Sequence, residues 1–182
     1  MSISKDLEER ILKLAKRYDT SKRHYAKVGI SDSEIATYAS YVEFGWTQTV
    51  TPAQSAYLRA HTNGGGPKPG AVLYNPPRPI FRGTFASEHS KWTKAITKAL
   101  KTSDELTALK TAGLIAQSDL KATIANGGAT KQKFSPRSDL TMKLYANKAH
   151  GHKTNSTPGN TKTRKPLVLT GAMLNAIGVE IE

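Results

Sequence analysis

The spacing of apolar residues along the chain predicts mainly helices. In residues 4–18, Leu7, Ile11, Leu14 and Tyr18 recur every three or four positions, with acidic residues in the first turn and basic residues toward the end. This pattern is typical of an amphipathic helix whose charges match the helix dipole. Similar spacing predicts helices that cover about 34–44, 85–101, 106–124 and 138–147, and a short one at 52–60.

A smaller part of the chain has the character of β-strands. Residues 24–30 read as one strand, and the alternation of Ile177, Val179 and Ile181 predicts a terminal strand. The Pro-Pro-Arg-Pro stretch at 76–79 is expected to be extended, because proline fixes φ and disfavours a helical predecessor. The mixture predicts one α+β domain over residues 1–182, in which a small antiparallel or mixed sheet packs against several helices.

Two stretches are predicted to be long loops, at about 46–75 and 147–165. The first contains Asn-Gly-Gly-Gly-Pro-Lys-Pro-Gly at 63–70, which is incompatible with regular structure. The second contains basic residues among Gly, Ser, Thr and Asn, without core residues. Gly113, inside the 106–124 pattern, either divides that helix or lets a neighbour approach closely.

Charge is the next feature that narrows the function. The net charge is +13, and residues 46–102 alone hold eight basic residues against one acidic residue. Such an excess favours contact with DNA phosphates or with an acidic protein partner. The candidates for a DNA channel or a partner-facing surface are Lys68, Lys148, Lys153, Lys162, Arg164 and Lys165.

Several classes of protein are disfavoured. The chain has no cysteine, so disulfides and cysteine-ligated metals are excluded. The charged N-terminal stretch does not resemble a signal peptide, and no run reaches the ~18 apolar residues of a membrane span. The chain is therefore expected to be a soluble protein, made in the cytoplasm, that does not contact membranes.

The sequence also lacks a recognisable catalytic constellation. The nucleophile elbow, the phosphate-binding loop and the zinc-protease motif are all missing. His150 and His152 have no evident third ligand, and the triple glycine at 64–66 does not precede a helix, so it is interpreted as a hairpin tip. We expect a protein that is not an enzyme and that needs no cofactor or metal.

Three segments, in order, resemble the virion-morphogenesis and tail-completion (neck) family of tailed bacteriophages. They are ATYASYVEFG at 36–45, PRPIFR at 77–82 and KPLVLTGAMLNAI at 165–177. The first is similar to a helix that ends in Glu-Phe-Gly, the second to a Pro-Arg-Pro stretch before a long helix, and the third to an ending before a last strand. From the residues themselves, Glu43 is expected to pair with Arg78 or Arg82, within the subunit or across an interface. The motifs either close the monomer fold or form contacts between subunits.

The resemblance implies a structural subunit of the head–tail junction. Such a subunit would form a homo-oligomeric ring, of six-fold or twelve-fold symmetry with six-fold preferred. The ring would join the head-closure or connector protein to the tail terminator or tail tube, and double-stranded DNA would pass through its lumen in the virion. A basic nucleic-acid-binding module and a tail terminator that caps the tail tube are the alternatives. The candidate interface residues are Glu43, Phe44, Trp46, Tyr57, Arg78, Pro79, Phe81 and Arg82.

Overall fold

The computed structural model describes residues 9, 12–13, 24–148 and 171–182. Glu9, Leu12 and Lys13 are helical, and the rest of the predicted 4–18 helix lies outside the described residues. The described elements follow one another as β1 (Ala26–Ile30), α2 (Ser33–Phe44), β2 (Trp46–Thr49), α3 (Pro52–Ala60), β3 (Val72–Asn75), α4 (Phe81–Ala99), α5 (Glu105–Ala125), α6 (Asp139–Lys148), α7 (Ala172–Ala176) and β4 (Ile177–Ile181).

The fold is α+β, as predicted, but the strands form two small sheets instead of one. β1 pairs with β4 in antiparallel register, so that Ile30 faces Ile177 and Ala26 faces Ile181. β2 pairs with β3, also antiparallel, from Trp46 opposite Asn75 to Thr49 opposite Val72. The first sheet therefore joins two segments that lie about 150 positions apart in the sequence.

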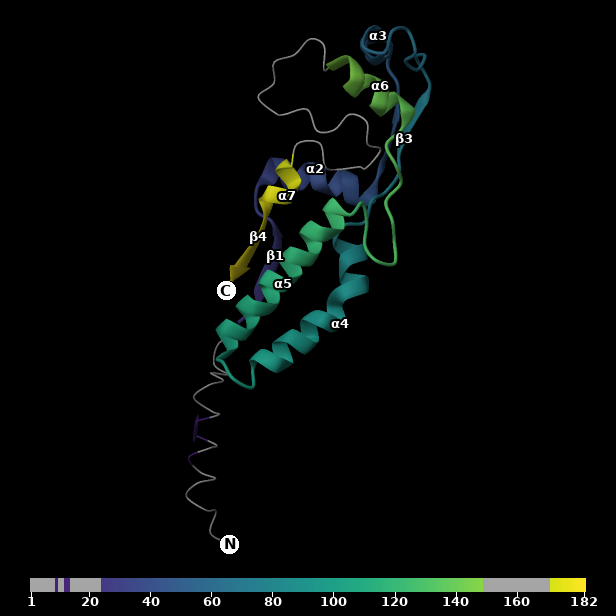
Figure 1. Ribbon diagram of the computed structural model, residues 1–182. Helices are drawn as coiled ribbons and strands as arrows, with labels where there is room; N and C mark the ends of the chain where they lie inside the picture. The colour runs from purple at the N-terminus through teal and green to yellow at the C-terminus, as the bar shows by residue number, and fades with distance from the viewer. Residues whose placement is uncertain (1–8, 10–11, 14–23, 149–170) are drawn as a thin grey trace.

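Helix α5 lies at the centre of the molecule, between α4 on one side and the β1–β4 sheet on the other (Figure 1). It is continuous from Glu105 to Ala125, so Gly113 does not divide it. A Cβ on Gly113 would lie 2.7 Å from the Cγ1 atom of Val179, so glycine allows β4 to approach the helix closely. Of the two expectations for Gly113, close packing is confirmed.

The main core lies where α2, α5, α7 and the start of α4 meet. Ile80, Ile124 and Ile177 are fully buried, and Val42 and Leu120 are nearly so. These residues belong to one cluster, which also includes Ala39, Phe134 and Met173. Burial of apolar side chains at about 25 cal/mol per Å² is the dominant stabilising contribution in such a core.

Within the long loop predicted at 46–75, the short helix predicted at 52–60 is confirmed as α3, but the two strands beside it were not predicted. The segment contains β2, α3 and β3, and we call residues 46–75 the arm. Backbone pairing of β2 with β3 closes it, and a capping box between Thr51 and Gln54 starts α3. In Figure 1, α3 and β3 lie at the far end of the molecule from the turn between α4 and α5. Residues 149–165 of the second predicted loop lie outside the described residues, whereas 147 and 148 belong to α6.

Helix α4 begins at Phe81, four residues before the predicted start at Phe85. Residues 76–79 belong to neither a helix nor a strand. Phe81 lies four residues before Phe85 and lines the same groove, so the apolar stripe of α4 already includes the first turn. The group that stabilises this turn comes from α2.

Candidate subunit-interaction surfaces

Glu43, the penultimate residue of α2, caps the N-terminus of α4. Its carboxylate accepts hydrogen bonds from the backbone amides of Ile80 (2.6 Å), Phe81 (3.0 Å) and Arg82 (3.1 Å). The first amides of a helix have no intrahelical acceptor, and the residue that precedes α4, Ile80, provides no side-chain cap. Glu43 is only 4% exposed. Its negative charge also lies at the positive end of the helix dipole.

Arg82 completes this contact from the side of α4. Its Nε donates to the Glu43 carboxylate at 3.1 Å, and its Nη2 donates to the Glu43 carbonyl oxygen at 2.9 Å. The guanidinium also lies 4.7 Å from the centre of the Phe44 ring, which is a cation–π distance. Glu43 thus pairs with Arg82, within the subunit.

Arg78 serves a different part of the fold. Its side chain is buried and donates to Asn75 Oδ1 (2.8 Å) and to the carbonyl oxygens of Ser135 (3.1 Å) and Pro136 (3.4 Å). Burial lowers the pKa of the Arg78 guanidinium from its ordinary value. Arg78 therefore connects the end of β3 to the segment before α6. The neighbouring residue Pro79 is half-buried.

The three segments that carry the family resemblance converge in space. Ala39 and Val42 from the first, Ile80 from the second, and Met173 and Ile177 from the third belong to the same buried cluster. Their buried members therefore close the monomer fold. The exposed members, which include Phe44 and Arg82, remain at the surface.

Large apolar side chains are exposed along α2 and the arm. Tyr41 and Phe44 lie on the outer face of α2, opposite the buried Ala39 and Val42. The arm adds four further exposed apolar residues, namely Trp46, Tyr57, Val72 and Tyr74. Exposed aromatic residues of this kind are enriched in protein interfaces. Of the eight predicted interface residues, Phe44, Trp46, Tyr57 and Arg82 are accessible, Pro79 and Phe81 are half-buried, and Glu43 and Arg78 are buried.

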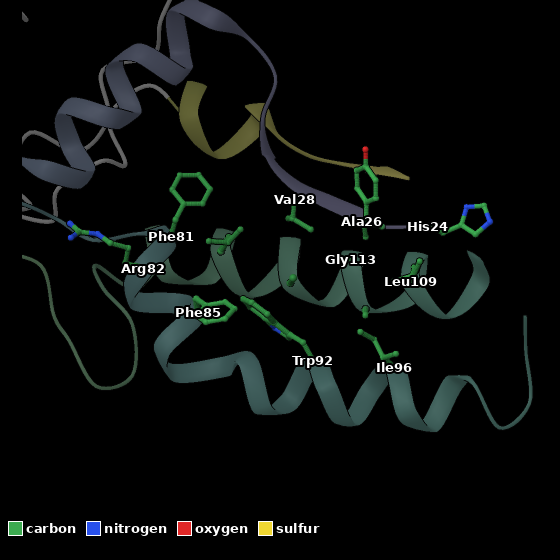
Figure 2. Close-up of a pocket in the computed structure, with 14 residues that line it drawn as sticks. His24, Ala26, Val28, Phe81, Arg82, Phe85, Trp92, Ile96, Leu109 and Gly113 are labelled. Carbon is green, nitrogen blue, oxygen red and sulfur yellow. The ribbon is translucent and has the colours of Figure 1, made fainter. Parts of the chain in front are cut away.

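An open apolar groove, which the sequence did not reveal, runs between α4 and β1 (Figure 2). Its volume is about 680 Å³. Its floor is α5, with the small residues Ala112, Gly113 and Ala116 between Leu109 and Leu120. One wall is formed by Phe85, Trp92 and Ile96 of α4, and the other by Ala26 and Val28 of β1.

The α4 wall of the groove is fixed in position by polar contacts at its back. The indole Nε1 of Trp92 donates to Asp119 Oδ2 at 2.7 Å, and Lys91 forms an ion pair with the other oxygen at 2.6 Å. The rings of Phe85 and Trp92 pack edge to face at 6.0 Å. Phe85 nevertheless remains 60% exposed.

The basic residues fall into two groups. Lys68 is exposed in the arm, and Lys148 ends α6, whereas Lys153, Lys162, Arg164 and Lys165 lie outside the described residues. The structure adds a group that the sequence prediction did not assign to a function. Lys94, Lys98 and Lys101 lie on one exposed face of α4 and its C-terminal turn, opposite the side that lines the groove. Their spacing of four and three residues was the available signal.

Two further kinds of feature, metal sites and membrane-spanning helices, were looked for in the part of the chain that the structure describes. No three His, Asp or Glu side chains there lie together as metal ligands, and no helix there is long and apolar enough to cross a membrane. His150 and His152 lie outside this part. No protein family, no curated protein and no solved structure matches the chain.

Proposed function

We propose that this chain is a structural subunit of the head–tail junction of a tailed bacteriophage. In this proposal it assembles into a ring that joins the connector to the tail and lets DNA pass. The observation that carries the proposal is the convergence of the three family-like segments on one buried cluster. Five of the eight buried residues of this cluster come from these segments, which supports the resemblance.

The distribution of exposed apolar surface supports assembly. The aromatic face of α2, the arm and the groove are each left uncovered in the single chain. Exposed apolar surface in patches commonly marks interaction sites. Because the three surfaces differ from one another, contacts between them would be head-to-tail, and such contacts generate rings when the rotation closes.

The test is the assembly state of the purified chain. Native mass spectrometry and negative-stain images over a range of concentrations should show closed rings of one stoichiometry, with six subunits preferred. Pull-downs with connector and tail-tube proteins would then distinguish a neck ring from a tail terminator, which should bind the tail tube alone. A chain that stays monomeric at every concentration and binds neither protein would contradict the proposal.

The lysine face of α4 favours a second candidate, a nucleic-acid-binding module. Lys94, Lys98 and Lys101 lie on one face of about two helical turns. A monomer that binds duplex DNA with a steep salt dependence would support this candidate over the ring.

A further inference from the structure

We propose that the groove between α4 and β1 receives the N-terminal amphipathic segment, residues 4–18, of a neighbouring copy of the chain. The inference rests on the proposed ring, for which it provides a specific contact between subunits. The groove is open and apolar, and its floor is made of small side chains that let another backbone approach. An amphipathic helix in an apolar groove is a recurrent mode of recognition.

The floor of the groove and the segment agree in length. The α5 floor runs from Leu109 to Leu120. It covers eleven residue steps, or about 16 Å of helix at ~1.5 Å per residue. The apolar stripe from Leu7 to Tyr18 also covers eleven steps. One face of that helix would therefore cover the floor along its length, while the α4 wall continues past Phe85 to Phe81 and Arg82.

The place where the described chain begins again brings the segment close to a groove in sequence. Of the segment itself, Leu12 is described, and it is helical and 60% exposed. The continuously described chain resumes at His24, which lines one end of the groove. Only five residues separate His24 from the end of the 4–18 segment.

Charge gives the direction of docking. Arg82 lies at the end of the groove near Phe81, with a side chain that is 58% exposed. The acidic residues of the segment, Asp6, Glu8 and Glu9, belong to its first turn. We therefore place the first turn of the docked segment at the end of the groove that Arg82 lines. In this orientation Leu7 of the segment lies next to Phe85 of the groove.

Disulfide trapping in the full-length chain tests this assignment, because the chain has no native cysteine. A Leu7→Cys chain is mixed with a Phe85→Cys chain that carries a larger tag, and the mixture is oxidised mildly. A disulfide-linked heterodimer is expected. The control pair, Leu7→Cys with Leu114→Cys, should not link, since Leu114 is an exposed residue of α5 outside the groove.

The outcomes separate this inference from the proposed function. Rings without a Leu7–Phe85 heterodimer would overturn the groove contact and leave the ring intact. A heterodimer without rings would support the groove contact and contradict the ring. If a chain that carries both cysteines closes on itself at monomer size while the mixture does not link, docking is within the subunit and the inference is wrong.

A second measurement does not depend on cysteine geometry. Phe85→Ser should raise the concentration at which half of the chains are assembled by about tenfold or more, because it removes an exposed aromatic contact from the groove. Leu114→Ser changes another exposed apolar residue, which lies outside the groove, and should leave this concentration unchanged. Equal effects of the two substitutions would overturn the inference.

Discussion

Glu43 replaces a local helix cap with one supplied from a distant position in the sequence. Three consecutive amides, those of Ile80 and of the first two residues of α4, donate to its carboxylate, which is buried. A charged acceptor in such a place forms stronger hydrogen bonds than a neutral one. The last turn of α2 and the first turn of α4 are therefore joined through a single side chain.

The first prediction concerns this carboxylate. Glu43→Gln removes the charge and turns an NH2 donor toward groups that are themselves donors, so the free energy of unfolding should fall by about 2–4 kcal/mol. Urea denaturation followed by circular dichroism measures the change. The matched control is Glu34→Gln, an exposed residue of the same helix, which should change the free energy by less than about 0.5 kcal/mol. Similar values for both variants would show that the cap does not depend on the charge.

Gly45 is the second residue on which this junction depends. Its φ is +74°, and a Cβ there would lie 2.6 Å from the Asn75 oxygen and 2.8 Å from the Pro77 nitrogen. Gly45→Ala should therefore lower the free energy of unfolding by about 2–4 kcal/mol. Gly29→Ala is the control, because a Cβ at Gly29 meets nothing within 4 Å, and it should cause no loss. Thermal melts of both variants check this, and an unchanged melting temperature for Gly45→Ala would refute the prediction.

At the scale of single residues, the sequence predicted that Glu43 pairs with a nearby arginine, but not which arginine. Glu43 precedes Phe44 and Gly45 at the end of a predicted helix, and two arginines lie on either side of Pro79. This was enough to predict an ion pair with Glu43. These features did not decide between Arg78 and Arg82, because that choice depends on the direction in which the chain re-enters the core. The amides of residues 80–82 have no sequence signal at all, since every residue except proline has one.

Among the elements, α5 depends on close contact with the sheet. Gly113 lets Val179 of β4 approach the helix axis. Alanine at this position gains about 1 kcal/mol of helix propensity but meets a methyl group at 2.7 Å. The packing contribution should be the larger one, because overpacking a well-packed contact costs about 1–3 kcal/mol.

The third prediction is a double-mutant cycle on this contact. Gly113→Ala alone should destabilise the protein, and Val179→Ala alone should also do so. Together they should cost at least about 1 kcal/mol less than the sum of the two, because the second substitution removes the methyl groups that the first one meets. The unfolding free energies of the four proteins measure this coupling, and additive values would mean that the cost of Gly113→Ala does not come from contact with Val179.

The ends of β1 and β4 are joined by exposed charges. Glu182 accepts hydrogen bonds from Lys27 Nζ (2.7 Å) and from the Tyr25 hydroxyl (2.8 Å). These hydrogen bonds lower the pKa of the Glu182 carboxyl, while the bonds to Glu182 raise the pKa of Lys27 and of Tyr25. Because the pKa of this carboxyl is lowered, the carboxylate stabilises the fold at pH values above the ordinary pKa of glutamate. This stabilisation is lost as the pH falls through the lowered pKa. The stabilisation from Lys27 and Tyr25 is complete below their ordinary pKa values and is lost only at high pH.

The fourth prediction follows from these signs. Glu182→Gln should be slightly less stable than the parent chain at pH 7, and the difference should shrink as the pH falls toward 3. High salt should shrink it as well, because the groups are exposed. Unfolding free energies of both proteins at several pH values measure it. A difference that stays constant between pH 7 and pH 3 would show that the carboxylate charge has no role.

Helices with regularly spaced apolar residues were predictable from the sequence. The short strands of the arm, which are held together by backbone hydrogen bonds, were not. The spacing from Phe85 onward predicts most of α4, and that from Leu106 onward predicts α5. In the arm, the helix at 52–60 was predicted, but the two strands were interpreted as loop because both are short and β2 is exposed along its whole length. A short exposed strand has no buried face, and therefore no clear alternation of apolar and polar residues to reveal it.

For the whole molecule, α4 separates two kinds of surface. Its inner face carries Phe85, Trp92 and Ile96 into the groove, and its outer face carries the exposed lysines. A ring that forms through the groove would leave the outer face free of that contact. The sequence predicted the excess of positive charge in residues 46–102, but only the three-dimensional arrangement gathers part of it on one face.

The fifth prediction asks whether this face contacts DNA. Replacing Lys94, Lys98 and Lys101 by glutamine should weaken binding to duplex DNA and should flatten its salt dependence. The slope of log K against log salt concentration changes by about 0.9 for each phosphate contact, so three lost contacts would reduce it by up to about 3. Fluorescence anisotropy with a labelled duplex at several salt concentrations measures both quantities. Glutamine at Lys110, Lys131 and Lys133, three exposed residues outside α4, gives the same change in net charge and should reduce the slope less. If both triple substitutions reduce the salt slope equally, DNA binding depends on the overall charge of the protein. A localised contact would depend on which lysines are removed.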